Sequence, residues 1–204
     1  MAEAFYSRLV IIVEGASERE ALPLLCAALG LKFDSEGISV AASGGKTVID
    51  TLLQLYQAHG IKTYVIFDND KGKTTDERAY NKVICRVLEI SETDLPAPQI
   101  SDHYAILDGN WEQQVQADLA SIDPNLYLNL VVEARAALGI KGNKNKPLVA
   151  RYVAEQLVAR NVTLPFIKNI TEKLKQRLGL IKTQPDKNSD FDFDEDITDE
   201  DIPF

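Results

Sequence analysis

Four acidic residues follow two apolar runs, and their placement suggests a metal site. Glu14 and Glu18 come after the run 9–13, and Asp68 and Asp70 come after a second run further along the chain. Each run is short and rich in β-branched residues, which is typical of a strand buried on both faces of a parallel sheet. Such sheets bind ligands beyond the C-terminal ends of their strands. Carboxylates gathered there repel one another unless a cation lies among them, and Mg²⁺ prefers oxygen ligands of this kind.

Other interpretations of these acids stay open at this point. Glu18 falls in the first turn of the following helix, where a carboxylate also compensates the helix dipole. That explanation suits Glu14 poorly, because a buried strand end is a costly place for a lone carboxylate. Asp68 and Asp70 point to one side if the backbone stays extended between them. The alternative is an Asp/Asn-rich turn with no chemical role.

The elements that position these residues alternate between strands and helices. The apolar periodicity predicts strands at 9–14, 38–40, 62–67 and 103–107. Ser17 with Glu20 fits a capping box for the first helix, which would end at Gly30. Further helices are expected at 46–60, 76–88, 111–121, 124–138, 147–160 and 165–178. This order predicts an α/β fold with a largely parallel sheet flanked by helices, and with additional C-terminal helices.

The two acidic segments also resemble a known family. Strand-Glu-Gly followed by strand-Asp-x-Asp is similar to the Toprim domain of primases, topoisomerases and related nucleases. The longer stretches, VEGASERE at 13–20 and YVIFDNDKGK at 64–73, resemble the nucleases of the OLD (overcoming lysogenization defect) family. The resemblance implies a Rossmann-like Toprim core at 1–110 and a helical extension at 111–183 that completes the catalytic region. An acidic tail at 184–204 is expected to be disordered.

The same resemblance implies a third acidic segment and a lysine. The stretch ILDGNWE at 106–112 occupies the expected position, with Glu112 as the best match and Asp108 as a second candidate ligand. Asn110 stands where a second acid is expected; in the alternative interpretation this stretch is a turn and helix cap, with Trp111 in the core. Lys146, before Pro147 of the loop NKNKP, matches the family lysine, with Lys144 as the second choice.

These residues predict a metal-dependent DNA endonuclease that hydrolyses phosphodiester bonds with two Mg²⁺ or Mn²⁺ ions. In such sites the ions stabilise the attacking and leaving oxygens, and a lysine offsets charge on the phosphate. The expected catalytic residues are Glu14, Glu18, Asp68, Asp70, Glu112 and Lys146, and the expected metal ligands are Glu14, Glu18, Asp68, Asp70, Asp108 and Glu112. Alternatives are a ribonuclease of the rRNA-maturation type, a phosphotransferase of the Asp-x-Asp class and a degenerate Toprim docking module.

Net charge at first argues against a nucleic-acid partner, because the chain carries −9 at pH 7. Residues 186–204, however, contain nine acidic residues and one basic residue, so the remainder is close to neutral. Basic residues concentrate in the C-terminal helices, which keeps DNA binding open. The Gly44-Gly45 pair before Lys46 is read as an ordinary turn, yet Lys46 is expected to contact a phosphate. The full set of expected nucleic-acid contacts is Lys46, Lys71, Lys73, Lys144 and Arg151.

The remaining expectations concern partners and location. No apolar stretch is long enough to span a bilayer and the N-terminus lacks a signal-peptide pattern, so we expect a cytoplasmic protein without membrane contact. Cys26 and Cys85 are read as small buried hydrophobic residues and not as a disulfide or zinc pair. The resemblance implies an N-terminal ABC-type ATPase domain as partner; no G-x-x-x-x-G-K-[ST] motif occurs here, so that domain is expected to be absent from this chain. A helicase is a further candidate partner.

Overall fold

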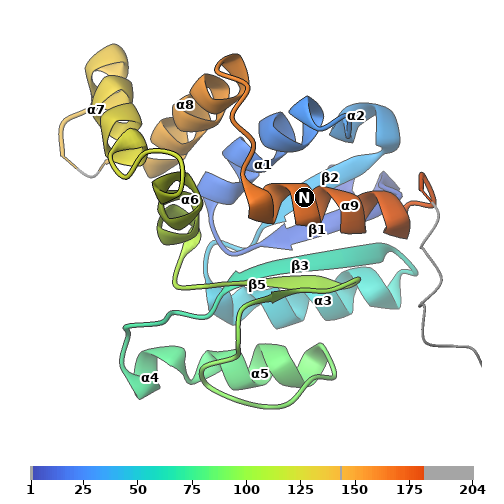
Figure 1. The fold of residues 1–204 in the computed structure, drawn as a ribbon. Helices are drawn as coiled ribbons and strands as arrows, with labels where there is room; N and C mark the ends of the chain where they lie inside the picture. Colours follow the sequence, from blue (N-terminus) through green and yellow to red (C-terminus); the bar gives the residue numbers. More distant parts are fainter. Residues whose placement is uncertain (1, 143, 182–204) are drawn as a thin grey trace, which may run out of the picture.

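A five-stranded sheet forms the centre of the molecule, with helices on both faces (Figure 1). The computed structural model describes residues 2–142 and 144–181. The strands are β1 (Leu9–Val13), β2 (Ile38–Ala42), β3 (Lys62–Asp68), β4 (Gln99–Ile100) and β5 (Tyr104–Leu107). Their spatial order is β2-β1-β3-β5-β4, and every pairing is parallel except that of β4 with β5. The expected α/β fold with a mostly parallel sheet is confirmed.

The strand order creates a switch point between β1 and β3. From β1 the chain moves to β2 on one side and then crosses back to β3 on the other. Connections leave the two neighbouring strands in opposite directions, which opens a crevice beyond their C-terminal ends. Val13 is paired with Ile66 in this register, so Glu14 and Asp68 follow the paired ends of the two strands.

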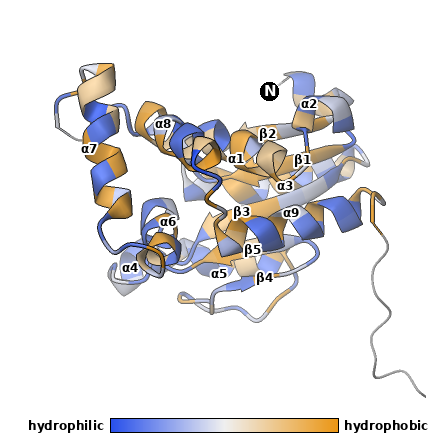
Figure 2. Ribbon diagram, turned by 45° about the horizontal axis from the view of Figure 1, so that its top comes forward, coloured by the Kyte–Doolittle hydropathy of each residue, from blue (hydrophilic) through white to orange (hydrophobic). Residues whose placement is uncertain are grey.

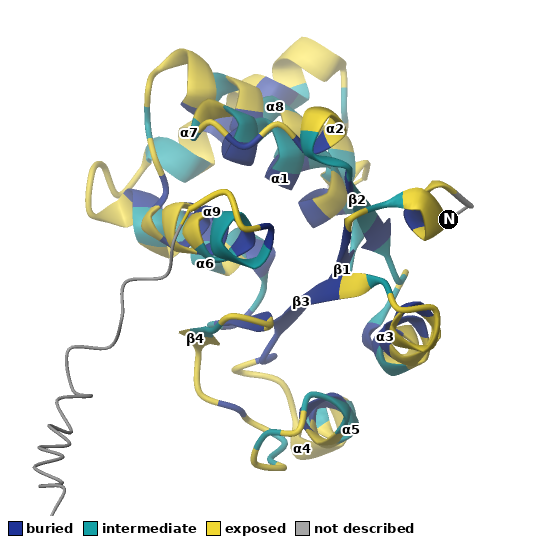
Figure 3. Ribbon diagram, turned by 90° about the vertical axis from the view of Figure 1, so that its right-hand side faces the viewer, coloured by how far each residue is buried: buried dark blue, intermediate teal, exposed yellow. Residues whose placement is uncertain are grey.

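Helices cover the sheet in two layers, seen on either side of the buried strands in Figure 3. One layer contains α1 (Ala16–Ala28), α8 (Lys146–Ala159) and α9 (Pro165–Arg177), with α6 (Trp111–Ala120) and α7 (Leu126–Leu138) beside them. The other layer contains α3 (Ile49–Ala58) and α5 (Tyr80–Val87). The shorter elements are the 3₁₀ turns Ala2–Tyr6 (η1) and Lys46–Val48 (η2), with α2 (Phe33–Glu36) and α4 (Thr75–Arg78).

Strand β1 contributes side chains to both hydrophobic cores, because successive side chains of a strand point to opposite faces of the sheet. Leu9, Ile11 and Val13 lie in the core under α1, α8 and α9. Val10 and Ile12 lie in the opposite core under α3 and α5. All five side chains are fully buried, which explains the unbroken apolar run in the sequence. Figure 2 shows the same segregation as hydrophobic strands between amphipathic helices.

Several local predictions need correction. The capping box at Ser17 is wrong: α1 begins at Ala16, its N-cap is Gly15, and no side chain caps it. The single helix expected at 76–88 is two helices, and the one over 46–60 begins with a 3₁₀ turn. Strand β4 and helix α2 were not expected, because elements of two and four residues are too short to show a period.

The remaining structural expectations have mixed outcomes. Cys26 and Cys85 are buried and free, as expected. None of the described helices is long and apolar enough to cross a bilayer. The expected tail at 184–204 lies outside the described residues. The division of the chain at residue 110 stays a prediction, although α6, α8 and α9 share one core with β1 and β3.

Candidate active site

Carboxylates from β1 and β3 meet at the switch point. The side chain of Glu14 is 20 % exposed, and Asp68 and Asp70 are 8 % and 4 % exposed. Glu14 Oε2 and Asp68 Oδ1 are both buried and have no hydrogen-bond partner. Buried polar oxygens in native proteins are nearly always satisfied. Two orphan carboxylate oxygens from neighbouring strand ends therefore favour a site that accepts a cationic ligand.

Lys46 supplies the central counter-charge in this structure. Its ammonium donates to the backbone oxygen of Asp68 at 2.6 Å and to Oδ2 of Asp70, and it lies 3.7 Å from Oε2 of Glu14. Only 8 % of the residue is exposed. The sequence analysis expected Lys46 to contact a phosphate, but the structure turns its ammonium toward the carboxylates. One ammonium thus bridges Glu14 and Asp70.

Burial and mutual repulsion raise the pKa of three acids in the cluster. Burial is the main cause of the raised pKa of Asp68, to about 8, and the charges of Glu14 and Glu18 add to it. Burial likewise raises the pKa of Glu18 to about 7, with smaller contributions from Glu14 and Glu112. Burial also raises the pKa of Glu14, against the opposing effect of Lys46. These shifts have the signature of carboxylates that lack enough positive charge.

Asp70 is held differently from its neighbours. Its φ of 56° places it in the left-handed region, so the extended backbone assumed for the Asp68–Asp70 pair is wrong. Burial would raise its pKa, but hydrogen bonds from Lys46 and Lys73 outweigh burial and lower it. Lys73 lies 2.6 Å from Oδ1. Asp70 is therefore ionised and already paired.

Asn69 and Asn81 hold this corner, and the sequence analysis missed both. The side-chain oxygen of Asn69 accepts from the backbone of Lys71 at 2.9 Å and of Gly109 at 2.8 Å, which ties the end of β3 to the loop after β5. Asn81 is fully buried and donates to the backbone oxygens of Asn69 and Asp94. In the sequence, the only sign of such a role is the position of Asn69 between Asp68 and Asp70.

Gly15 allows Glu18 to fold back toward the strand end. A Cβ at position 15 would lie 2.9 Å from Oε2 of Glu18, closer than real contacts allow. A larger residue here would push the Glu18 carboxylate aside, while the backbone φ of −126° is open to any residue. Glu18 is 4 % exposed and points into the cluster, not outward as a solvated helix-dipole carboxylate would.

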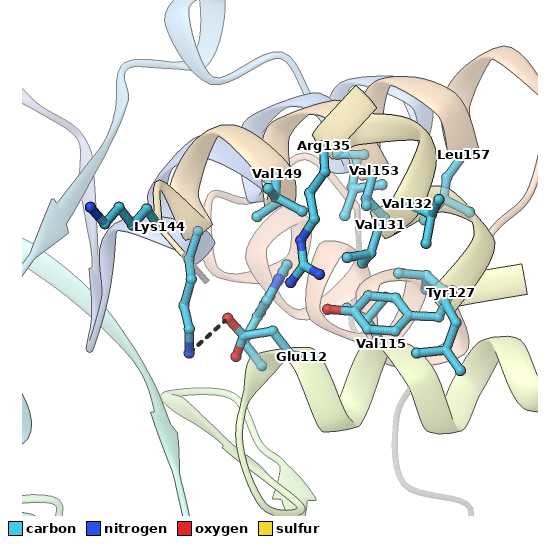
Figure 4. Close-up of a pocket in the computed structure, with 18 residues that line it drawn as sticks. Glu112, Val115, Tyr127, Val131, Val132, Arg135, Lys144, Val149, Val153 and Leu157 are labelled. Carbon is cyan, nitrogen blue, oxygen red and sulfur yellow. Dashed lines mark ion pairs between the residues drawn. The ribbon is translucent and has the colours of Figure 1, made fainter. Parts of the chain in front are cut away.

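The third acidic segment lies at the start of α6. Asn110 caps this helix in a reciprocal capping box with Gln113, and Trp111 is 3 % exposed, so the turn-and-cap interpretation is confirmed for these residues. Glu112 lies one residue further, with Lys146 at 3.9 Å (Figure 4). Asp108 instead pairs with Lys71 at 3.0 Å. Glu112 is near enough to Glu18 for its charge to help raise the pKa of Glu18, whereas Asp108 pairs with the exposed Lys71.

The other basic residues form an exposed rim. Lys144 and Lys146 are exposed at the start of α8, where backbone N–H groups and the helix dipole favour anions. Arg151, one turn along the same helix, lies 3.7 Å from Glu20 and 3.0 Å from Glu155. The expected contacts Lys71, Lys144 and Arg151 are thus accessible, whereas Lys73 is half-exposed and bound to Asp70.

No three acidic, histidine or cysteine side chains among the described residues stand in an arrangement that encloses an ion. The donor set nevertheless fits hard divalent cations, which take several carboxylate oxygens at once. The orphan oxygens of Glu14 and Asp68 and the raised pKa values of Asp68 and Glu18 point the same way. A cation entering the cluster would satisfy the oxygens that the ammonium of Lys46 leaves without a partner.

The sequence around the strand-end cluster is similar to a known family. Residues 5–70 match the family model described as overcoming lysogenization defect protein-like, TOPRIM domain. The matched range contains Glu14, Glu18, Asp68 and Asp70, and it ends before Asp108, Glu112 and Lys146. No curated protein sequence matches the chain significantly.

Solved structures share the Toprim-containing fold over most of the chain. The C-terminal region of the Xanthomonas campestris pv. campestris OLD protein is 17 % identical, with a TM-score of 0.58, and the match covers 86 % of this chain and 98 % of that one. The C-terminal region of the Burkholderia pseudomallei OLD protein is 20 % identical, with a TM-score of 0.56 and coverage of 85 % and 99 %. The predicted fold is therefore confirmed, and the resemblance inferred from the sequence agrees with the family model over residues 5–70.

Proposed function

We propose that this chain is the catalytic region of a metal-dependent endonuclease that hydrolyses DNA phosphodiester bonds. The observation that carries the proposal is the convergence of Glu14, Glu18, Asp68 and Asp70 at the switch point, where Glu14 Oε2 and Asp68 Oδ1 are buried without a hydrogen bond. Sites built only from carboxylates suit Mg²⁺ or Mn²⁺ better than soft metals.

The chain divides the proposed ligand set between two regions. Glu14, Asp68 and Asp70 would hold one divalent ion, and Glu18 and Glu112 would hold the other. Asp108 is the weakest member of the proposed set because it already pairs with Lys71. When bound, such ions supply Lewis-acid stabilisation of the attacking and leaving oxygens.

The residues of the chain then orient the phosphate and compensate its charge. Lys146 lies 3.9 Å from Glu112 and at the first turn of α8. An ammonium and a helix N-terminus aimed at one place would stabilise charge developing on the phosphate in the transition state. Lys71, Lys144 and Arg151 would bind neighbouring phosphates along the strand. Asn69 keeps the Asp68–Asp70 corner fixed to the loop that precedes Glu112.

The partners and setting follow from the family. The solved relatives are described as C-terminal regions of OLD proteins, so an N-terminal ABC-type ATPase is the proposed partner domain, with a helicase as a further candidate. The free buried cysteines fit a reducing, cytoplasmic setting.

The test is a plasmid-cleavage assay with Mg²⁺, Mn²⁺, Ca²⁺ or EDTA, run beside a structured RNA substrate. We expect nicked or linear plasmid with Mg²⁺ or Mn²⁺ and none with EDTA. Cleavage that persists in EDTA would refute the metal-dependent mechanism. Cutting of RNA alone would favour the ribonuclease alternative, and calorimetry without any metal binding would favour the docking module.

A further inference from the structure

An apolar cavity lies directly beside Glu112 and Lys146. It lies between α1, α6, α7 and α8, is open to solvent on one side, and has a volume of about 360 Å³. That volume lies within the range of roughly 300–1,000 Å³ that is usual for small-molecule sites. Part of its apolar lining meets water, since Leu128 and Val132 are exposed. An exposed apolar pocket of this kind often marks a ligand-binding site, and this one lies next to the proposed catalytic residues.

The walls and the mouth of the cavity differ in chemistry. Valine, leucine and alanine side chains form most of the wall, including Val115, Val131, Val153 and Leu157. Lys144, Lys146 and Arg135 bring positive charge to the lining, against the single carboxylate of Glu112. Figure 4 shows the guanidinium of Arg135 and the hydroxyl of Tyr127 gathered at the same end as Glu112.

This combination suits one kind of ligand. An occupant needs a flat apolar body for the valine-lined wall, polar edges for Arg135 and Tyr127, and a negative group for Lys144 and Lys146. A nucleobase with its attached phosphate has all three features. Single-stranded nucleic acid is bound in this way in general, by stacking or apolar contact with the base and by cationic contact with the backbone. An apolar helix or a lipid tail would offer no negative group to Lys144 and Lys146.

We propose that the cavity takes one unpaired nucleobase of the DNA strand, next to the phosphate that is cut. The proposal rests on the proposed nuclease function, because Glu112 and Lys146 line both sites. It names the substrate class: DNA with an unpaired base at the cut position, as in single strands, flaps or frayed ends. Enzymes that need a base out of the stack act most readily where it is already unpaired.

Trp111 is a built-in reporter for this test. It is the single tryptophan of the chain, it lines the cavity, and it is 3 % exposed. With Ca²⁺ present, a short single-stranded oligonucleotide should change its fluorescence. A series of oligonucleotides of this sequence is then compared, each with a single abasic site at a different position. At one position the abasic site should lower the affinity for the protein roughly tenfold. Equal affinity at every position would overturn the proposal.

Cavity-filling variants give a second measurement. Val131→Phe and Ala150→Leu place extra volume in the cavity and should reduce affinity for the intact oligonucleotide to that of the abasic one. Val158→Phe is the matched control, because Val158 is on α8, 37 % exposed and outside the lining. Thermal unfolding checks that each variant folds. Two folded filling variants that bind like the control would refute the inference.

Two further measurements separate a free nucleotide from DNA as the ligand, and failure of the cavity proposal from failure of the nuclease proposal. If deoxyadenosine monophosphate changes Trp111 fluorescence as strongly as the oligonucleotide does, the ligand is a free nucleotide and the DNA proposal is wrong. Plasmid cleavage without any abasic-site effect would overturn the cavity inference and leave the nuclease function standing. A position-specific abasic effect without cleavage would support the cavity and count against the nuclease function.

Discussion

The strand-end cluster of Glu14, Glu18, Asp68 and Asp70 differs from the pair Glu112 and Lys146 on α6 and α8, here called the helical arm. Both place carboxylates near a lysine, but the degree of burial is opposite. In the cluster, Asp68 and Asp70 are buried, and the charge of Lys46 does not satisfy every oxygen. In the arm, Lys146 is 66 % exposed and Glu112 is 31 % exposed, and they face each other at 3.9 Å. Buried carboxylates raise the energy of the folded protein until a cation joins them, whereas exposed ones cost little. The cluster is therefore the part built around a cation, and the arm the part that meets solvent and substrate.

Asp68→Asn is the sharpest test of that difference and should have the largest effect. It keeps the shape of the side chain but removes the charge of a proposed ligand. We expect cleavage to fall by at least ~10³-fold, because metal ions supply several kcal/mol of transition-state stabilisation. Plasmid nicking measures it, with the exposed Asp76→Asn as the matched control. If Asp68→Asn cleaves plasmid as fast as the wild type does, the cluster has no role in the mechanism.

Lys46→Met tests whether the ammonium provides the counter-charge of the cluster. Removing one partner of a buried ion pair typically costs about 3–5 kcal/mol, so the variant should unfold at lower denaturant concentration in EDTA. Added Mg²⁺ should restore more stability to the variant than to the wild type, because the carboxylates then lack their ammonium. An equal Mg²⁺ effect in both proteins would contradict this account.

Lys146→Ala tests the arm. We expect cleavage to fall by about 10–100-fold with little change in stability, because the residue is exposed and its proposed role is electrostatic. Lys146→Arg should recover part of the activity, and Lys141→Ala, in the same loop, is the control. A large loss of stability in Lys146→Ala would show that Lys146 is needed for folding, as Lys46 is expected to be, and would contradict the proposed difference between the arm and the cluster.

The pH dependence of stability should also distinguish the cluster. The pKa of Asp68 is raised from 3.8 to about 8, so the folded state retains a proton that the unfolded chain releases. Ionising Asp68 therefore destabilises the metal-free protein progressively as pH rises from about 4 to about 8, and there is no penalty below that window. Denaturant titrations in EDTA should show Asp68→Asn gaining stability over wild type across this window. A pH-independent difference would be inconsistent with the raised pKa.

Arg151→Ala should have the smallest effect. Its two ion pairs are at the surface, where such pairs contribute about 0–1 kcal/mol. Binding of DNA should weaken two- to threefold, with a salt dependence reduced by roughly one phosphate contact. Filter binding over a salt series measures both. If DNA affinity falls tenfold or more, Arg151 contributes more to DNA binding than an exposed residue with one phosphate contact can explain.

The sequence predicted what depends on local pattern. The β-branched runs located β1, β3 and β5, and the strand-end acids together with the glycine after Glu14 pointed to the family whose model matches residues 5–70. Helix ends were predicted to within a few residues wherever an apolar face was long, as in α8 and α9. These features follow from periods of two and 3.6 residues that the chain displays directly.

What escaped prediction depends on contacts between distant residues. Lys46 is buried because its ammonium reaches Asp68 and Asp70, more than twenty positions away. Asn69 matters because it binds Gly109, forty positions away. Neither contact leaves a periodic trace, and a lysine after two glycines equally suits a surface turn. Asp70, whose φ is left-handed, likewise donates its backbone N–H to the distant backbone oxygen of Gly109.

The shared core of early strands and late helices has a consequence for synthesis of the protein. Leu9 and Ile11, near the start of the chain, pack in one cluster with Ile167, Ile170 and Leu174 of α9. A growing polypeptide cannot bury these first strands until α9 has emerged from the ribosome. We therefore expect the segment 1–110, made alone, to aggregate, and the acidic cluster to form only after nearly all of the described chain has been translated.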